Sequence, residues 1–158
     1  MKKIATLLLI TTFTTLLFSE ELKIEADSFT SDQNTGISIF NSNVNIQKAN
    51  DELNASKVTI YVNKKKKPIK FVAAGNVSFV IVTKDGAKYS GVAGRVIYFP
   101  KKKKYCFYEN VHLKQLNDKK EILGDEVVLK TTDGKAYAKG LEKEPVIMIF
   151  NIDEKKSR

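Results

Sequence analysis

The sequence has 158 residues, with 27 Lys and Arg against 18 Asp and Glu, which gives a formal net charge of +9. Its single cysteine, Cys106, excludes an intramolecular disulfide and a Cys-rich metal site, and its single histidine, His112, excludes a cluster of His ligands. A surface of this charge favours anionic partners.

Residues 1–19 have the order of a secretory signal peptide. Two lysines precede an uncharged run at 4–18, and Ser19 stands at the expected cleavage position. A helix of about 15 residues reaches about 22 Å, less than a hydrocarbon core of roughly 30 Å. We therefore expect cleavage and one exported domain, 20–158, although the large Leu17 leaves retention as a membrane anchor open. An exported protein seldom meets nucleic acid, so we expect none as a partner.

The rest of the chain has the alternation of apolar and polar residues that half-buried strands require. It is clearest in VTIYV at 58–62, VSFVIVT at 77–83 and VHLKQ at 111–115. Turn signals separate such runs: NTG at 34–36, KDG at 84–86 and TDG at 132–134. Asp-Gly between strands predicts a hairpin with a type I′ turn. No helical period follows residue 19, so the mature protein is predicted to be nearly all β.

A short phrase, Asn-Val followed by a polar and an apolar residue, occurs three times. It begins at Asn43, Asn76 and Asn110. A companion of the form small-x-x-apolar precedes each copy as ADSF, ASKV and AGRV, and a fourth, GDEV, precedes the last hairpin. Repeated units built only of strands predict a stack of hairpins, a sheet folded over on itself. In that stack we expect each Asn to begin a strand after a tight bend.

These phrases resemble the OstA-like family, the lipopolysaccharide-transport periplasmic proteins of Gram-negative bacteria. IEADSF…FNSNVNI, LNASKVTIYV…FVAAGNVSF and FYENVHL match units of the form Ile-x-Ala-Asp, a turn and Phe-x-Gly-Asn-Val. The likeness extends from about Leu22 to Gly140. The sequence departs from the pattern at Ser42 and Glu109, which replace Gly, and at Ser56, which replaces Asp.

The resemblance implies an all-β fold, an open and slightly twisted β-jelly roll of two antiparallel sheets built from repeated hairpin units. It implies a periplasmic carrier that holds the acyl chains of lipopolysaccharide between the sheets and takes part in a bridge from the inner to the outer membrane. The implied partners are lipopolysaccharide, further copies stacked end to end as a homo-oligomer, and an inner-membrane transport subunit and outer-membrane translocon of similar fold. No cofactor is implied.

A carrier of acyl chains needs a groove lined by apolar side chains. The inward positions of the predicted strands supply candidates, each of which could equally belong to a closed core. The predicted groove residues are Ile37, Ile39, Val44, Ile46, Val58, Ile60, Val77, Phe79, Ile81, Val96, Tyr98, Phe107, Val111, Leu113, Val127 and Leu129.

Two runs of four lysines are predicted at hairpin tips. They comprise Lys64, Lys65, Lys66 and Lys67, and Lys101, Lys102, Lys103 and Lys104. Such runs usually keep a turn solvated. The more specific hypothesis is that they contact lipid phosphates at the rim of the groove, since the ammonium group of lysine binds phosphate well.

The first and last strands, near 22–26 and 146–152, are predicted to be free edges at which another copy could pair. The last strand could instead fold back onto the groove. No combination of residues indicates catalysis: His112 lies on the polar face of its strand, and no phosphate loop or nucleophile elbow is present. Two other functions remain open, an inner-membrane-anchored subunit of the same route and an unrelated secreted polysaccharide-binding β protein.

Overall fold

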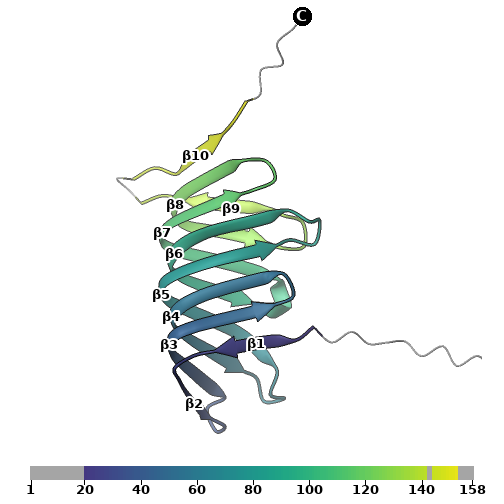
Figure 1. The fold of residues 1–158 in the computed structure, drawn as a ribbon, viewed down its shortest axis with the longest axis vertical. Coiled ribbons are helices and arrows are strands. Elements are labelled where there is room, and N and C mark those ends of the chain that lie inside the picture. The colour runs from purple at the N-terminus through teal and green to yellow at the C-terminus, as the bar shows by residue number, and fades with distance from the viewer. Residues whose placement is uncertain (1–19, 142–143, 153–158) are drawn as a thin grey trace, which may run out of the picture.

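The computed structural model describes residues 20–141 and 144–152, and Figure 1 shows them as one ladder of long strands. The predicted signal peptide at 1–19 lies outside the described residues. Ten strands form one antiparallel sheet in the order β1-β3-β4-β5-β6-β7-β8-β10, with β2 also paired to β3 and β9 to β8. Their bounds are β1 Leu22–Glu25, β2 Ser28–Asp32, β3 Ile37–Lys48, β4 Asp51–Val62, β5 Pro68–Val82, β6 Lys88–Phe99, β7 Lys104–Gln115, β8 Lys120–Lys130, β9 Ala136–Lys139 and β10 Ile147–Phe150.

Each long strand bends near its middle, so the sheet folds into two layers that share one corner. The register shifts there in every pair from β3–β4 to β7–β8. We call the two layers leaves. The first leaf consists of β1, 44–48, 51–54, 77–82, 88–93, 111–115, 120–124 and β10. The second leaf consists of β2, 37–41, 57–62, 68–74, 95–99, 104–108, 126–130 and β9. This architecture confirms the predicted open, all-β fold of two facing antiparallel layers.

The repeated Asn-Val phrase forms this corner. Asn43, Asn76 and Asn110 have φ of 50°, 47° and 53°, and the residue before each also has a positive φ. Asn tolerates this left-handed region better than most residues because its short side chain makes local hydrogen bonds. The expectation that Asn begins a strand was therefore wrong, since each bend lies inside a continuous strand.

The small residues of the companion phrase lie against the corner in neighbouring strands. A Cβ atom added to Gly94 would lie 2.7 Å from Glu109 Cβ, and one added to Gly75 would lie 2.8 Å from Ser56 Cβ. At the start of the chain, the Asn43 side-chain amide donates a hydrogen bond of 2.8 Å to Asp27. The Asn-Val motif and the small-x-x-apolar motif thus lie beside each other in neighbouring strands, at the same bend.

The core fills the corner between the leaves. Val44, Val77 and Val111 of the first leaf face Val58, Val96, Phe107, Val127 and Leu129 of the second, and all are at most 2% exposed. Burying one side chain of this size stabilises a fold by about 1.5–3 kcal/mol. This packing, and no disulfide, holds the described part of the domain together.

The predicted turns at 34–36, 84–86 and 132–134 are all present, but they are not of type I′. Only the glycine of each has a positive φ, 70° at Gly36, 88° at Gly86 and 65° at Gly134. In the middle turn the Gly86 N–H donates to Thr83 O and the Thr83 N–H to Ala87 O, both at 2.9 Å. This is a turn with a glycine bulge, in which Gly occupies the one position that needs a left-handed backbone.

Candidate binding groove

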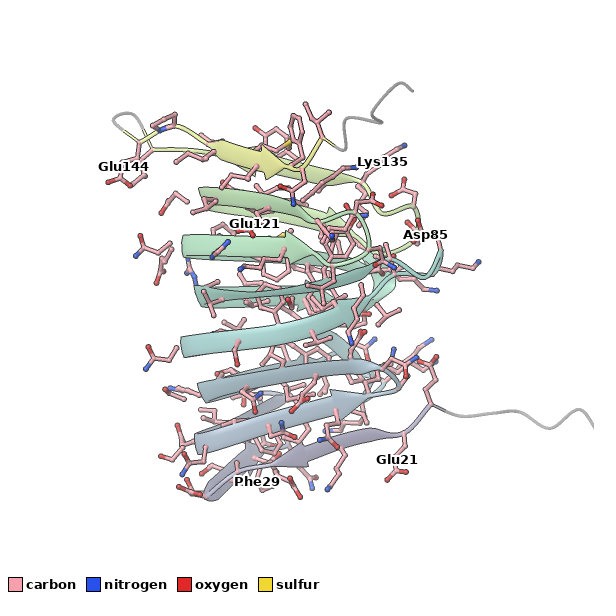
Figure 2. The ribbon with its side chains drawn as sticks, turned by 45° about the horizontal axis from the view of Figure 1, so that its top comes forward. Glu21, Phe29, Asp85, Glu121, Lys135 and Glu144 are labelled. Atoms are coloured by element: carbon pink, nitrogen blue, oxygen red, sulfur yellow. The ribbon has the colours of Figure 1, made fainter. Side chains whose placement is uncertain are left out.

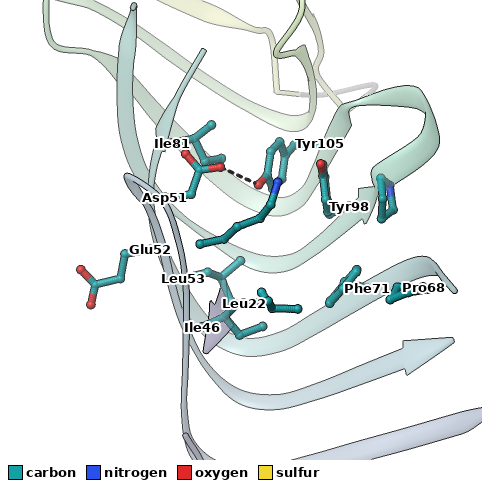
Figure 3. A pocket seen from close by; sticks show the side chains of 12 residues that line it. Leu22, Ile46, Asp51, Glu52, Leu53, Pro68, Phe71, Ile81, Tyr98 and Tyr105 are labelled. Carbon is teal, nitrogen blue, oxygen red and sulfur yellow. Dashed lines mark hydrogen bonds between the residues drawn. The ribbon is translucent and has the colours of Figure 1, made fainter. Parts of the chain in front are cut away.

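A cavity of about 230 Å³ opens between the leaves on the side of β1. Leu22, Ile46 and Leu53 of the first leaf form one wall, and Phe71 and Tyr98 of the second leaf face them (Figure 3). The remaining lining residues are Lys48, Asp51, Glu52, Pro68, Ile81, Pro100 and Tyr105. The cavity is therefore apolar along its length, with a few polar groups at one end.

A buried polar link crosses from one leaf to the other at that end. The Tyr105 hydroxyl donates a hydrogen bond of 3.2 Å to Asp51 Oδ2, and the Val82 N–H donates one of 2.8 Å to Asp51 Oδ1 (Figure 3). Burial raises the pKa of Asp51 above its ordinary value of 3.8, and burial also raises the pKa of Tyr105 well above 10.0. These groups fix the distance between the leaves beside the cavity.

The rim of the cavity carries an ion pair. Lys48 Nζ lies 2.9 Å from Glu20 Oε2, in the segment that precedes β1. The hydrogen bond to Glu20 raises the pKa of Lys48, and the same contact lowers the pKa of Glu20. The pair holds residues 20–22 close to the opening.

A second cavity of about 360 Å³ lies between the leaves near β10. Leu113 and Ile122 of the first leaf line it together with Ala136 of β9 and Met148 and Phe150 of β10. Buried side chains separate the two cavities, notably Phe79 and Phe107, whose ring centroids are 4.4 Å apart. The space between the leaves is thus open at both ends of the ladder and packed in the middle. One continuous groove had been predicted, so this expectation differs from the structure.

The free tips of the two leaves meet above this packed centre. The Lys84 N–H in the turn between β5 and β6 donates a hydrogen bond of 2.9 Å to Thr131 O in the turn between β8 and β9. The Thr131 N–H in turn donates to Lys103 O at 2.9 Å. Figure 2 shows the turns that carry Asp85 and Lys135 at the same end of the molecule. The bond from Lys84 to Thr131 therefore joins the two leaves at this point, and the bond from Thr131 to Lys103 lies within the second leaf.

The structure divides the predicted groove residues into three groups. Ile46, Ile81 and Tyr98 line the first cavity, and Leu113 lines the second. Ten lie in the buried core: Val44, Val58, Ile60, Val77, Phe79, Val96, Phe107, Val111, Val127 and Leu129. Ile37 and Ile39 pair with Tyr61 and Thr59 and lie on the outer face, opposite to Val58 and Ile60. The structure therefore does not bring Ile37 and Ile39 together with the other fourteen.

Several cavity residues were missed from the sequence. Phe71 has the same alternation as Ala73 and Val77 and could have been found by extending that strand towards its start. Leu53 is five residues from Val58, so a period of two places them on opposite faces, but the bend in β4 returns both to the interior. Asp51 gave no sequence signal, because its role depends on Tyr105 in a distant strand.

Both lysine runs lie at tips of the second leaf, as predicted. Lys64–Lys67 connects β4 to β5, and Lys101–Lys104 covers most of a single 3₁₀ turn, η1 (Pro100–Lys102), and the start of β7. The two runs adjoin Pro68 and Pro100, which line the first cavity. All four lysines at 64–67 are exposed, and Lys66 Nζ donates a hydrogen bond of 3.0 Å to Gln33 O.

His112, the single histidine of the sequence, contacts an acidic side chain outside the candidate groove. His112 lies on the outer face of the first leaf, and its Nε2 is 2.6 Å from Glu121 Oε2. The contact with His112 lowers the pKa of Glu121. Within residues 20–141 and 144–152, no three His, Cys, Asp or Glu side chains are placed to hold a metal, and no helix is long and apolar enough to cross a membrane.

The fold is similar to a solved structure of a transport protein. The crystal structure of LptH from Pseudomonas aeruginosa, described as the LptA homologous periplasmic component of the conserved lipopolysaccharide transport device, superposes with a TM-score of 0.73. The two chains are 15% identical, and the alignment covers 84% of this chain and 96% of LptH. Among curated proteins, no relative matches the sequence.

A family model provides the sequence-level assignment. Residues 23–135 match the family described as LptA/(LptD N-terminal domain) LPS transport protein. The match covers most of the chain and confirms the family predicted from the Asn-Val and small-x-x-apolar phrases. The protein belongs to the LptA/(LptD N-terminal domain) family of lipopolysaccharide transport proteins.

Proposed function

We propose that this protein is a periplasmic lipopolysaccharide carrier that holds acyl chains between its leaves and forms part of a bridge from the inner to the outer membrane. The observation that carries the proposal is the apolar cavity beside β1, open to solvent and walled by side chains of both leaves. An exposed apolar cavity is retained in a protein when a ligand fills it. Acyl chains match its lack of polar groups along the walls.

The size of the cavity indicates that the leaves move on binding. Sites for drug-sized ligands have volumes of about 300–1,000 Å³, and the first cavity has about 230 Å³. Several acyl chains therefore fit only if the leaves separate. The contacts that such a movement would break are the hydrogen bond from the Lys84 N–H to Thr131 O and the one from the Tyr105 hydroxyl to Asp51.

The two lysine runs suit the phosphates of the same lipid. They lie on the second leaf directly beside Pro68 and Pro100 at the cavity mouth. An acyl chain in the cavity would leave its polar head near these ammonium groups, which favour phosphate. We infer that Lys64–Lys67 and Lys101–Lys104 contact the head group, with no single lysine essential.

The edges of the sheet suit end-to-end assembly. β1 and β2 form one edge of the described ladder, and β9 and β10 form the other. All four residues of β10 are apolar and exposed, and β10 pairs with β8 at the edge, where Met148 and Phe150 also line the second cavity. Pairing of β10 with the first strands of another copy, or of a transport subunit of similar fold, would cover this edge.

Lipopolysaccharide binding by residues 20–158 tests the proposal. Phe71→Glu places a charge in the cavity wall at a half-buried position, and Val92→Glu places the same charge on the outer face at a side chain that is 51% exposed. We expect saturable binding that Phe71→Glu weakens about tenfold or more and that Val92→Glu leaves unchanged. Equal binding of lipopolysaccharide stripped of its acyl chains would instead support the polysaccharide-binding alternative.

The anchored alternative has a separate test. A carrier that acts between the membranes must lose residues 1–19, whereas an anchored subunit keeps them. The intact mass of the protein recovered from cells distinguishes the two. A mass that includes residues 1–19 would replace the carrier with an anchored subunit of the same route.

A further inference from the structure

The outer face of the second leaf carries one continuous apolar row across the sheet. The strand register aligns Ile39, Thr59, Val72, Ile97, Cys106, Val128 and Tyr137 in that order, from β3 to β9. These side chains point away from the groove, since their neighbours Val58, Phe107 and Val127 are buried between the leaves. Tyr137 at the end of the row is 63% exposed, Cys106 is 4% exposed, and the other members, among them the polar Thr59, are half-buried. The outer face of an antiparallel sheet is normally polar, so a row of mostly apolar residues on it is unusual.

Cations and aromatic rings flank the apolar row on both sides. Lys57, Arg95 and Lys139 lie towards the corner, and Lys70, Lys104 and Lys130 lie towards the free tips. Lys70 Nζ lies 4.1 Å from the centre of the Tyr61 ring, and Arg95 Cζ lies 4.8 Å from that of Tyr108. The acidic residues of these flanking rows are Asp32 and Glu126. The face therefore has six cations against two carboxylates.

Few of these cations are neutralised. Among the residues that the structure describes, Arg95 is paired with Glu109, at 3.6 Å, and the five lysines of the face have no carboxylate within 4.0 Å. Lys57, Lys130 and Lys139 are exposed. Their charge is available to an external anion.

The outer face of the first leaf provides an internal comparison. It has Lys23, Lys88 and Lys114 against Glu25, Glu52 and Glu121, so its charges balance. Lys23 pairs with Glu25 at 2.8 Å, and Lys114 pairs with Glu121 at 3.6 Å. The excess of positive charge thus belongs to one face and not to the sheet as a whole.

We propose that the outer face of the second leaf docks the protein on the surface of a bilayer that contains anionic lipid. Lysines and tyrosines around an apolar strip match the water–lipid interface, where ammonium groups reach phosphates and aromatic rings lie at the level of the head groups. A hydrophilic polyanion would satisfy the lysines but leave the apolar row in water. A second copy that presented the same face would be repelled, because both faces carry an excess of positive charge.

Docking on a bilayer is a property separate from binding a lipid in the groove. It would also fix the orientation of the groove relative to the membrane. The tips at Lys64–Lys67 and Lys101–Lys104 belong to the same leaf as the docking face and border the cavity mouth. A protein lying on this face would hold the mouth close to the membrane surface. The carrier could then collect or deliver a lipid without crossing open solvent.

Tryptophan fluorescence tests the orientation, because the sequence contains no Trp. Tyr137→Trp places the single reporter on the docking face, and Val92→Trp places it on the outer face of the first leaf, at a side chain that is 51% exposed. The vesicles are phosphatidylcholine with and without phosphatidylglycerol. We expect a blue shift for Tyr137→Trp with phosphatidylglycerol vesicles only, and none for Val92→Trp. A shift at position 92, or no shift at either position, would overturn the proposal.

Matched charge variants test the recognition. Lys57→Gln/Lys130→Gln/Lys139→Gln should weaken sedimentation with phosphatidylglycerol vesicles about tenfold or more, since each lysine near an anionic surface contributes about 1 kcal/mol. Lys23→Gln/Lys88→Gln/Lys114→Gln makes the same change in net charge and should have less than about a third of that effect. Equal loss in both variants would show attraction to net charge alone and refute a docking face. Phe71→Glu should bind vesicles normally, so failure of the groove and failure of the docking face are distinguishable.

Discussion

The Tyr105 hydroxyl donates a hydrogen bond of 3.2 Å to the Asp51 carboxylate, and this contact joins the two leaves beside the candidate groove. Tyr105 is the second residue of β7, in the second leaf, and Asp51 is the first residue of β4, in the first leaf. Because burial raises the pKa of Asp51, the folded protein holds its proton more tightly than the unfolded chain does. The stability of the fold is therefore linked to pH through Asp51.

The first prediction concerns this linkage. A raised folded pKa means that the contribution of Asp51 to stability is greatest below its ordinary pKa of 3.8 and is lost as pH rises through the raised value. Asp51→Asn removes the charge and keeps an acceptor for the Val82 N–H. The free energy of unfolding of Asp51→Asn minus that of wild type should therefore increase with pH across this window. Urea unfolding of both proteins at a series of pH values measures this difference in the free energy of unfolding. A difference that stays constant or falls with pH would contradict a raised pKa of Asp51.

The second prediction concerns the corner. Asn76 has φ of 47°, a conformation that costs a β-branched residue about 1–2 kcal/mol. Asn76→Val should lower the free energy of unfolding by about that amount, whereas Asn76→Gly should change it by only a few tenths of a kcal/mol. Ser78→Val, two residues further along β5 in the extended part of the strand, is the control. If Val is tolerated equally at 76 and 78, the bend does not depend on the left-handed residue.

The third prediction concerns the closure between the leaves. In a Cys106→Ala background, Lys84→Cys/Thr131→Cys places two cysteines at turns joined by a backbone hydrogen bond of 2.9 Å. The oxidised protein should lose most lipopolysaccharide binding and regain it on reduction, because a disulfide would prevent the leaves from separating. Ser31→Cys/Ser38→Cys, which links β2 to β3 inside one leaf, should bind equally in both states. Full binding by the oxidised Lys84→Cys/Thr131→Cys protein would exclude a movement of the tips.

The fourth prediction concerns the exposed last strand. Ile147→Lys/Ile149→Lys puts two charges on the outward side of β10, where both side chains are about half exposed, so the fold should be unaffected. Sedimentation velocity should show concentration-dependent association of wild type that these substitutions reduce several-fold. Leu116→Lys, at an exposed position in the turn between β7 and β8, should associate as wild type does. Unchanged association of the β10 variant would remove this strand from the proposed assembly.

The architecture followed from local sequence patterns because the repeated phrases encode a repeated backbone shape. Asn before Val and small residues opposite it are what a sharp bend in adjacent strands requires, and alternation identified the buried face at Val58, Val77 and Val111. The phrases could not show that the bend lies within a strand. A turn between strands and a bulge inside one use the same residues.

The groove was harder to predict because burial and groove lining have the same sequence signature. Phe79 is apolar and inward-facing, yet it is 3% exposed and packs on Phe107 in the closed centre. Phe71, on the same face, lines the cavity. Distance from the corner does not distinguish lining from core, because Ile46 and Leu53 are in register with Phe79 and line the cavity. Their position near the β1 end of the ladder does, and this position becomes known only when the strand order is known. Ile37 and Ile39 also alternate regularly, but on the outer face.

Site-specific photo-crosslinking tests whether lipopolysaccharide lies between the leaves. A photoreactive phenylalanine analogue at Phe71 lies in the cavity wall, and the same analogue at Val92 lies on the outer face of the first leaf. In cells that export lipopolysaccharide, we expect a lipopolysaccharide adduct at position 71 and none at position 92. Adducts of equal yield at both positions, or an adduct at position 92 alone, would show that the lipid does not occupy the space between the leaves.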